Sequence, residues 1–324
     1  MKNKSLVDDC THCHACQNQC EFLKKYGIDI GDTKELEKLA YHCFLCGKCT
    51  EVCPEGIDGR LYILELRRKQ TEASGGEVKE KGYGMLLKEK RDYLYKNYRH
   101  AQGESVLFPG CNFPSFYPKT TKKLVDELKK YGIGVAYDCC GKPVAELGME
   151  ADEKRIISRI NQELAERKIK EVIMLCPNCY AYLEPRLTGV KIVSIYEKLN
   201  ELGIGRRNLT EGKVFLPCPD RESRELLHQI EQYVNGMLIP VKDMQCCGLG
   251  GCAPVKEPEL ARNMGLALRD TKEEKIYSYC ASCAGNLNRN GCKKVVHILT
   301  EIMETYEKAD TGKSMLNRIK TKFI

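Results

Sequence analysis

Cysteine constrains this chain more than any other residue, because 20 of its 324 residues are cysteines and most of them stand in regularly spaced groups. No run of 18 apolar residues occurs, and no apolar stretch precedes the first cysteines, so we expect neither a transmembrane helix nor a secretory signal. We therefore expect a cytoplasmic protein. In that reducing compartment thiols bind metal more often than they form disulfides. The cysteines are therefore expected to be metal ligands.

The spacing of the cysteines divides the chain into four segments. We expect a helical cluster-binding domain first, then a solvated connecting helix without cysteine, broken by Gly82 and Gly84, and then two cysteine-rich halves. The four segments are 1–70, 71–100, 101–205 and 206–324.

Two runs of cysteines in the first segment share the spacing C-x2-C-x2-C-x3-C. They resemble bacterial two-cluster ferredoxins, in which the fourth cysteine of each run binds the other 4Fe–4S cluster. The resemblance implies two cubane clusters, one held by Cys10, Cys13, Cys16 and Cys53 and the other by Cys43, Cys46, Cys49 and Cys20. Structural zinc is the alternative, although zinc sites need no such fixed order. Glu21 follows Cys20, where ferredoxins usually have proline.

The net charge of +7 counts every cysteine as neutral. Four thiolates around a 4Fe–4S core carry about −2 in total, so four such clusters bring the loaded protein close to neutral. The basic balance is therefore weak evidence for an acidic partner. The sequence contains no helix-turn-helix pattern and no dense basic stripe, and we expect no nucleic-acid partner.

The two cysteine-rich halves are copies of one another. In each copy β-rich runs alternate with charged, periodic helical segments, which predicts an α/β fold with helices on the faces of a sheet. The cysteines are expected at strand ends, where α/β proteins build their sites. The matching motifs are FPGC (108–111) and FLPC (215–218), CCG (139–141) and CCG (246–248), and CPNC (176–179) and CASC (280–283).

Each copy contains five cysteines, one more than a cubane or a tetrahedral zinc site uses. Adjacent cysteines on an extended strand point to opposite faces, so both serve one centre only if the chain turns. Gly141 and Gly248 follow the adjacent pairs and permit the backbone that such a turn needs. The pattern suggests an opened cluster, with one extra thiolate bridging iron or free for chemistry. The cysteines are Cys111, Cys139, Cys140, Cys176 and Cys179, then Cys218, Cys246, Cys247, Cys280 and Cys283.

The ferredoxin runs followed by two CCG motifs resemble the CCG-domain proteins of the heterodisulfide reductase B/D type. Related domains occur in iron–sulfur subunits of glycolate oxidase, lactate-utilisation and anaerobic glycerol-3-phosphate dehydrogenase systems. The resemblance implies a noncubane 4Fe–4S cluster in each copy, bound by its five cysteines. Zinc in one copy is the alternative, because some relatives hold zinc there. The chain is short for a D-type subunit, and its second copy opens with PCPDRES, so the substrate stays open.

The resemblance further implies an electron-transfer subunit of an anaerobic oxidoreductase complex. Electrons from a flavoprotein subunit or a ferredoxin would pass through the cubanes to the CCG clusters and reduce a disulfide or heterodisulfide. In reverse, the chain would relay electrons from a flavoprotein dehydrogenase to a quinone or a membrane cytochrome, and such a partner would hold it at the inner face of the membrane. A redox- or metal-sensing binding protein without turnover is the alternative from a different class.

The remaining chemistry-bearing residues are interpreted as structural. GLGG at 248–251 lacks the full G-x-G-x-x-G pattern, so nucleotide binding is not expected there. The basic tail, 308–324, is interpreted as a solvated end rather than a membrane anchor. The side chains interpreted in the same way are Cys252 and Cys292 as spare thiols, His12 and His14 as exposed loop residues, and His297 as a satisfied structural histidine.

Overall fold

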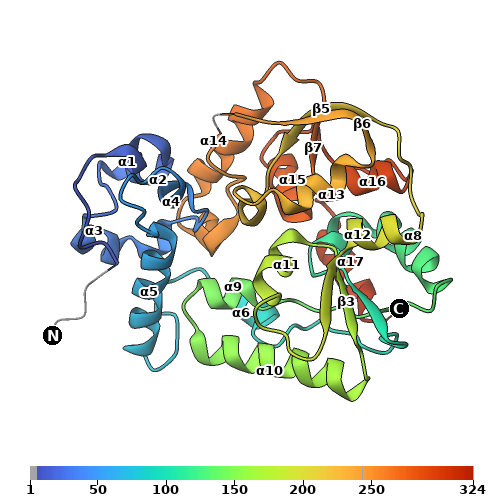
Figure 1. Ribbon diagram of the computed structural model, residues 1–324. Helices are drawn as coiled ribbons and strands as arrows, with labels where there is room; N and C mark the ends of the chain where they lie inside the picture. The colour runs from blue at the N-terminus through green and yellow to red at the C-terminus, as the bar shows by residue number, and fades with distance from the viewer. Residues whose placement is uncertain (1–5, 243, 324) are drawn as a thin grey trace.

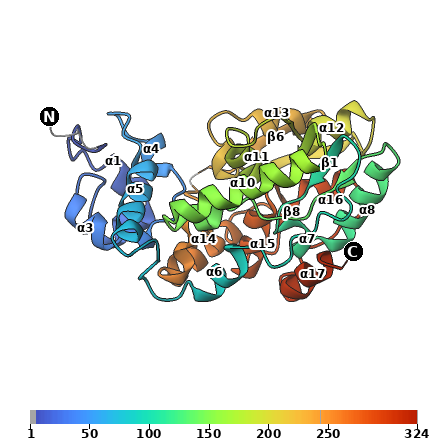
Figure 2. The same cartoon turned by 90° about the horizontal axis from the view of Figure 1, so that it is seen from below.

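The protein is described by a computed structural model that covers residues 6–242 and 244–323. Residues 1–5 of the first expected segment and Ile324 of the tail lie outside the described part. The N-terminal region sits at one end of the molecule and the two repeats form the rest (Figures 1 and 2). No helix in the described ranges is long and apolar enough to cross a membrane.

The N-terminal region is a group of short helices, as the sequence predicted. Its longest helix, α5, begins after Asp58, whose carboxylate accepts a hydrogen bond from the Leu61 N–H at 2.9 Å. Tyr62, Ile63 and Leu66 on α5 are buried against the rest of this region. The helices are α1 (Ala15–Gln19), α2 (Glu21–Tyr26), α3 (Thr33–Lys38), the 3-10 helix η1 (Ala40–His42), α4 (Lys48–Glu51) and α5 (Gly59–Glu72).

The segment 71–100 differs from the expected solvated helix. Its one helix in the described chain, α6 (Gly84–Lys90), begins at Gly84 instead of being broken by it. Tyr93 and Tyr98 are buried, and so is Lys90 at the end of the helix. Charged residues dominate the composition of this segment, but its tyrosines hold it against the first repeat. The segment is therefore part of the packed body of the protein.

Each repeat contains a four-stranded parallel sheet, and the two sheets have the same strand order. The first sheet has the order β2-β1-β3-β4 and the second has the order β6-β5-β7-β8. The predicted α/β fold and its internal repeat are therefore confirmed. The strands are β1 (Ser105–Phe108), β2 (Gly134–Val135), β3 (Glu171–Met174), β4 (Lys191–Ser194), β5 (Leu209–Phe215), β6 (Val234–Pro240), β7 (Ile276–Ser278) and β8 (Val295–His297).

Helices follow the strands in both repeats, and one apolar core contains residues of both sheets, among them Ile173 from β3 and Ile276 from β7. The two repeats therefore fold as one body. In the first repeat the helices are α7 (Phe113–Phe116), α8 (Pro118–Lys129), α9 (Lys142–Glu146), α10 (Glu150–Glu166), α11 (Pro177–Leu183) and α12 (Ile195–Glu201). In the second they are the 3-10 helix η2 (Cys218–Asp220), α13 (Glu225–Glu231), the 3-10 segment η3 (Gly250–Val255), α14 (Pro258–Arg269), α15 (Ala281–Arg289) and α16 (Ile298–Ile302).

The tail is not a solvated end, contrary to the sequence-based expectation. It contains a helix, α17 (Ser314–Thr321), that packs against α7 of the first repeat. The Ser115 hydroxyl donates to the carbonyl of Ser314 at 2.9 Å, and the Asn317 side chain donates to the carbonyl of Ser115 at 3.1 Å. These polar contacts to the backbone leave no trace in hydropathy, which is why the basic composition of the tail was misleading.

A fully buried arginine joins the N-terminal region to both repeats. The Arg67 guanidinium donates to the carbonyls of Ala40 and Cys43 in the N-terminal region at 2.8–3.0 Å. It also donates to the carbonyls of Glu146 in the first repeat and Gly251 in the second, both at 2.7 Å. One side chain thus satisfies backbone acceptors from three parts of the chain.

The GLGG segment is a place of close backbone approach. A Cβ on Gly250 would lie 2.4 Å from the Phe44 carbonyl oxygen, and a Cβ on Gly251 would lie 2.4 Å from that of Cys43. Gly251 also has a φ of +62°, which favours glycine. The glycines therefore let the second repeat pack directly on the loop that begins the second cysteine run.

Replacing Arg67 with methionine is expected to destabilise the protein strongly. The change leaves four buried carbonyls without their donor, at about 1–3 kcal/mol for each group, so we expect a loss of at least about 3 kcal/mol in the free energy of unfolding. Anoxic denaturant titration followed by circular dichroism measures it. Arg60→Met, at an exposed position on the same helix, is the control and should stay within about 0.5 kcal/mol. Equal midpoints for the two variants would contradict the role given to Arg67.

Candidate metal centres

Four cysteines line one small cavity in the N-terminal region: Cys10, Cys13, Cys16 and Cys53. This is the set that the ferredoxin resemblance implies for one cubane, with one member taken from the other run. Burial raises the pKa of Cys10, and the nearby Cys53 and Cys13 raise it further. The arrangement offers four soft sulfur donors around one point.

Asp29 lies buried beside this group, and the sequence analysis did not identify it. Its carboxylate lies 3.0 Å from Nδ1 of His12 and 3.2 Å from Nδ1 of His14, and it accepts the Gly31 N–H at 2.8 Å. Both histidines are more than half exposed, as expected, and both have a left-handed backbone with φ of 53° and 58°. Asp29 therefore fixes the strained loop that carries the first cysteines.

The other four N-terminal cysteines, Cys20, Cys43, Cys46 and Cys49, form a second group. Burial, followed by the nearby Cys46 and Cys43, raises the pKa of Cys20. Burial also raises the pKa of Cys43 to about 11. Cys49 has a raised pKa from burial and from Cys43, Cys46 and Cys20 around it. The structure thus brings together the set that the resemblance implies for the other cubane.

Glycines leave room for sulfur at both groups. A Cβ on Gly31 would lie 2.7 Å from Sγ of Cys10, and a Cβ on Gly59 would lie 2.7 Å from Sγ of Cys49. Each distance is too short for a real side chain. A side chain at either glycine would therefore collide with a cysteine sulfur. Iron–sulfur clusters, whose ligands are cysteine thiolates, fit two such sulfur-lined sites.

The five cysteines of the first repeat form one connected group at the ends of its strands. Hydrogen bonds from the thiols of Cys139 and Cys179 lower the pKa of Cys140 to about 5. Cys111 is hydrogen-bonded to Cys139, and Cys176 to Cys179. Cys111 follows β1, the CCG motif follows β2, and Cys176 directly precedes α11 after β3.

The expected turn after the adjacent cysteines is present in both repeats. Gly141 has a φ of +84° and Gly248 a φ of +75°. A Cβ on Gly141 would lie 2.8 Å from the Ile156 side chain, and one on Gly248 would lie 2.9 Å from Cα of Ala261. Glycine is therefore required both for the backbone conformation and for close packing against α10 in the first repeat and α14 in the second.

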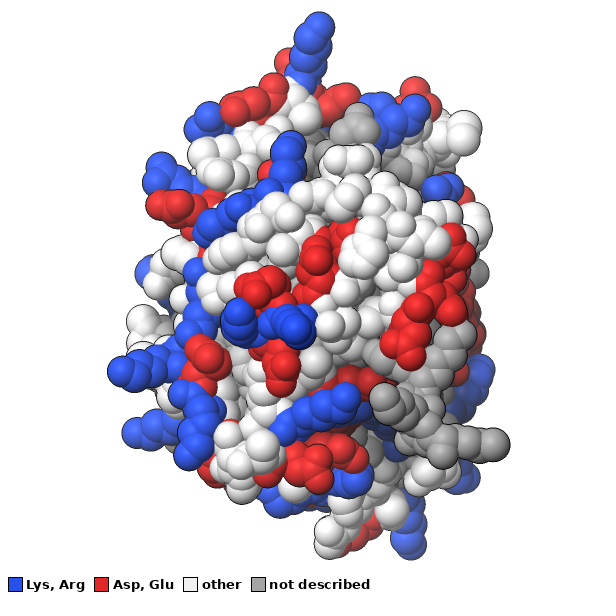
Figure 3. Space-filling view, turned by 90° about the vertical axis from the view of Figure 1, so that its left-hand side faces the viewer, with Lys and Arg blue, Asp and Glu red and all other residues white. Residues whose placement is uncertain are grey.

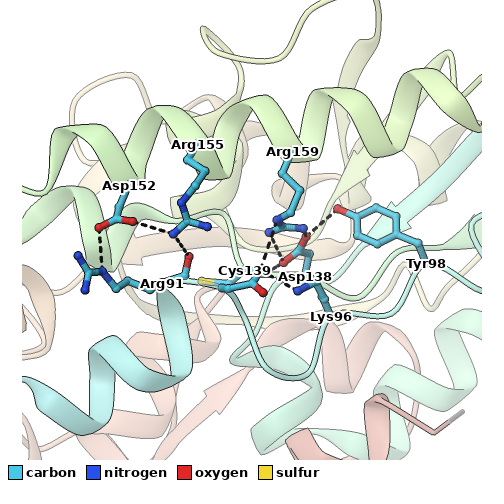
Figure 4. Close-up of polar contacts among 9 residues, drawn as sticks. Arg91, Lys96, Tyr98, Asp138, Cys139, Asp152, Arg155 and Arg159 are labelled. Atoms are coloured by element: carbon cyan, nitrogen blue, oxygen red, sulfur yellow. Dashed lines mark hydrogen bonds and ion pairs between the residues drawn. The ribbon is translucent and has the colours of Figure 1, made fainter.

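A buried ion pair holds the first CCG turn in place (Figure 4). Asp138 precedes the motif and is fully buried. Its carboxylate accepts hydrogen bonds from Nη1 of Arg159 at 2.6 Å, from the Tyr98 hydroxyl at 2.8 Å and from the Cys139 N–H at 2.7 Å. The figure shows Arg159 descending from α10 toward this carboxylate. The pair gives the Cys139 backbone a charged, fully hydrogen-bonded support.

The five cysteines of the second repeat occupy the corresponding places. Cys218 lies in η2 after β5, and Cys280 directly precedes α15 after β7. Cys283 is hydrogen-bonded to Cys247 and to Cys280. Cys246 and Cys247 both lie close to Cys218. The second repeat therefore also brings five thiols together in one group.

One cavity of about 760 Å³ connects the two groups. Its walls come from both repeats, from the loop at Phe44–Cys46, and from α6 and α17. Across the boundary between the repeats, a hydrogen bond from Cys176 lowers the pKa of Cys280. The cysteines in its walls are Cys46, Cys111, Cys139, Cys140, Cys176, Cys179, Cys218, Cys246, Cys247, Cys252 and Cys283.

The residues left unassigned by the sequence analysis are mostly buried. Cys252 lines the cavity at an unusual φ of 55°, and burial raises its pKa to about 12. Cys292 is buried in the apolar core. His297 is buried between Phe113 and Tyr117, and burial lowers its pKa to about 4. Its Nδ1 accepts the Leu299 N–H at 3.3 Å, whereas its buried Nε2 has no hydrogen-bond partner in the described part of the chain, so the expected satisfied histidine is satisfied at one nitrogen only.

Comparison with known families agrees with this arrangement. The family described as "4Fe-4S dicluster domain" matches residues 6–57. The family described as "Cysteine-rich domain", CCG, matches residues 105–184 and 213–288, one match for each repeat. The chain is a CCG-domain iron–sulfur protein. The resemblance inferred from the cysteine motifs is confirmed, and so is the presence of a ferredoxin-type region ahead of the two repeats.

Relatives of this CCG-domain protein include two from methanogenic archaea. An uncharacterized iron–sulfur protein of Methanococcus maripaludis is 22% identical, over 93% of this chain and 73% of the relative. The B subunit of the fumarate reductase (CoM/CoB) of Methanothermobacter marburgensis is 23% identical, over 85% of this chain and 66% of its own length. The crystal structure of a hypothetical protein from Helicobacter pylori shares the fold, with a TM-score of 0.53 at 10% identity, covering 91% of this chain and 68% of that one.

Replacing Asp138 with asparagine should weaken the first repeat. The change removes the charge that faces Arg159, and a hydrogen bond to a charged group contributes about 1.5–3 kcal/mol, so a loss in that range is expected. Anoxic thermal unfolding measures it. Glu150→Gln, which breaks an exposed pair with Lys154 on the same helix, is the control and should cost less than about 1 kcal/mol. An Asp138→Asn variant as stable as the control would refute the support role of the pair.

Proposed function

We propose that the chain is an electron-transfer subunit of an oxidoreductase complex, and that its cavity is where a disulfide is reduced or two thiols are oxidised. The observation that carries the proposal is the single cavity lined by cysteines of both repeats and by Cys46 of the N-terminal region. A disulfide has two sulfur atoms and needs one electron for each. Two cysteine groups that open into one cavity suit that demand.

The cluster ligands in this proposal are the cysteine groups described above. Bound clusters supply one-electron transfer. One cubane is assigned to Cys10, Cys13, Cys16 and Cys53, and the other to Cys43, Cys46, Cys49 and Cys20. The two CCG centres, proposed as noncubane 4Fe–4S clusters, are assigned to Cys111, Cys139, Cys140, Cys176 and Cys179, and to Cys218, Cys246, Cys247, Cys280 and Cys283.

The cavity contains more basic than acidic side chains. Five basic side chains line it, against two carboxylates. Glu89 lies 2.8 Å from Nζ of Lys90 and 2.6 Å from Nη1 of Arg318, and Glu146 is paired with Lys142. This surplus of positive charge offsets the negative charge of two bound clusters, since each cluster with its thiolates carries about −2. The basic residues are Lys88, Lys90, Lys142, Arg289 and Arg318.

The overall chemistry balances in either direction. One disulfide takes up two electrons and two protons, its S–S bond breaks, and two thiols form. In reverse, two thiols release two electrons and two protons as the S–S bond forms. The electrons come from, or go to, a one-electron partner such as a flavoprotein subunit or a ferredoxin. The CoM/CoB named for the relative in Methanothermobacter marburgensis motivates a thiol pair of this kind.

A partner subunit is part of the proposal because that relative is named as one subunit of a reductase. The face of the N-terminal region carries acidic and basic side chains in small interleaved groups (Figure 3). A partner that docks there would be matched by local charge pairs rather than by one broad field. The relay alternative has a quinone or a membrane cytochrome as acceptor and uses the same N-terminal clusters. It differs in that no disulfide reacts in the cavity.

Iron analysis tests the cofactor assignment. Protein purified or reconstituted without oxygen should hold about 16 iron atoms and about 16 sulfides in four 4Fe–4S centres. A value near 12 iron atoms with one zinc would assign zinc to one CCG half. Zinc alone after anoxic reconstitution would refute the proposal.

A disulfide-reductase assay separates the enzyme from the relay. With a reduced viologen as donor, the loaded protein should reduce the CoM–CoB heterodisulfide faster than it reduces cystine, because the relative in Methanothermobacter marburgensis is named for CoM/CoB. Cys140→Ala should abolish this activity, since Cys140 joins Cys139 and Cys179 at the middle of the first group. Reduction of the clusters by viologen without any disulfide turnover would exclude the enzyme and leave the relay.

A further inference from the structure

The internal repeats of this chain allow residues at matching positions to be compared. Gln245 directly precedes the second CCG motif, where the first has Asp138. Arg221 comes three residues after Cys218, and the matching residue after Cys111 is Pro114. The first cysteine run ends in Cys20–Glu21, whereas the second ends in Cys53–Pro54. These three differences meet at one place in the structure.

Gln245 connects the second repeat to the N-terminal cysteines. Its side chain is buried, and its Nε2 donates to Sγ of Cys20 at 3.4 Å and to Sγ of Cys46 at 3.6 Å. Asp138, in the matching position, turns instead to Arg159 on its own repeat. An aspartate could not donate to sulfur, so the change of residue type matches the change of role.

The Glu21 N–H fixes the orientation of that amide. It donates to Oε1 of Gln245 at 2.7 Å, which leaves Nε2 directed at the two sulfurs. Pro54, the matching residue of the other run, has no N–H and could not do this. The need for this N–H thus explains why Glu21, and not a proline, follows Cys20.

Arg221 links Gln245 to cysteines of the second repeat and of the N-terminal region. Its Nη2 donates to the carbonyl of Gln245 at 2.6 Å and lies 3.7 Å from Sγ of Cys218. Its Nη1 lies 3.4 Å from the Cys46 carbonyl and 3.3 Å from the Glu51 carboxylate. A guanidinium therefore stands between a cysteine of the N-terminal group and one of the second repeat.

The two cysteine groups are in direct contact at this place. Cys46 and Cys246 are both buried and lie in the same apolar cluster. Phe44, Ala253 and Met264 pack around the pair and exclude water. The first repeat meets the second farther on, where the Asn178 side chain next to Cys179 donates to Sγ of Cys280 at 3.5 Å.

We propose that Gln245 and Arg221 are positioning residues that couple the cluster of Cys20, Cys43, Cys46 and Cys49 to the second CCG centre, so that electrons reach the first CCG centre only after the second. This inference rests on the cluster assignments proposed above. Electrons arriving from the N-terminal clusters pass Cys46 and Cys246 first, and the first repeat holds the far end of the route.

The amide of Gln245 has a measurable effect in this arrangement. A reduced cluster carries one more negative charge than an oxidised one, and hydrogen bonds to its sulfur ligands stabilise that charge. The Gln245 donors therefore make the N-terminal cluster easier to reduce. Arg221 acts in the same direction on both centres, through its positive charge.

Redox titration followed by electron paramagnetic resonance (EPR) tests the role of Gln245 on the anoxic, cluster-loaded protein. In Gln245→Met the equilibrium constant for reducing the neighbouring cluster should fall at least tenfold, which is a shift of about 59 mV to more negative potential. Gln245→Glu keeps the size of the side chain, lacks the donors and should shift the potential in the same direction. Gln232→Met, at an exposed glutamine of the same repeat, should leave the potential unchanged.

The outcomes separate this inference from the function proposed above. An unshifted potential in Gln245→Glu or Gln245→Met, with the EPR signal of the cluster intact, overturns the role of Gln245. If Gln245→Met loses the cluster, the reduction potential measured in Gln245→Glu decides whether Gln245 has this role. Absence of any such cluster signal in the unmodified protein overturns the cluster assignment itself.

The order of the centres is tested by a matched pair of ligand variants. Cys179→Ser disables the first CCG group and should leave the rate of reduction of the second unchanged. Cys283→Ser disables the second and should slow reduction of the first at least tenfold. Freeze-quench EPR after mixing with a one-electron reductant measures both rates. Rapid reduction of the first group in Cys283→Ser overturns the proposed order.

Discussion

The buried guanidinium of Arg67 is the interaction on which the assembly of the three parts depends. It donates only to backbone carbonyls, from η1, from the second cysteine run and from both repeats. Each of those carbonyls lies where burial without a donor would be costly. The N-terminal cysteine groups are thus held at a fixed distance from the repeats. Electron transfer between centres requires such a fixed arrangement, and no flexible linker supplies it.

Duplication explains why cysteines of both repeats line one cavity. The differences between the copies underlie the proposed order in which electrons reach the two CCG centres. Both repeats place a CCG turn at a strand end, with a glycine that permits the turn and packs closely against α10 or α14. The residue before the turn then diverges. Asp138 ties the first copy to its own helix, whereas Gln245 reaches out of the second copy to the N-terminal cysteines.

Much of this structure follows from the sequence, because cysteine spacing and strand–helix alternation are local signals. They predicted the α/β repeats, the helical N-terminal region and the glycine turns. Contacts between distant residues left no such signal. Asp29 stands alone in the sequence, Lys90 looks like one more surface lysine in a charged segment, and Cys252 belongs to no motif. The segment 71–100 and the tail were misjudged for the same reason, since their buried tyrosines and amide contacts have partners far away in the chain.

Part of the cavity wall comes from α6 and α17, two helices that lie outside the α/β repeats. Glu89 on α6 and Arg318 on α17 meet across it, although they are 229 residues apart. A nascent chain that has completed both sheets but not yet its last helix would still expose the CCG cysteines on that side. Docking of α17 is therefore what encloses the cavity on that side.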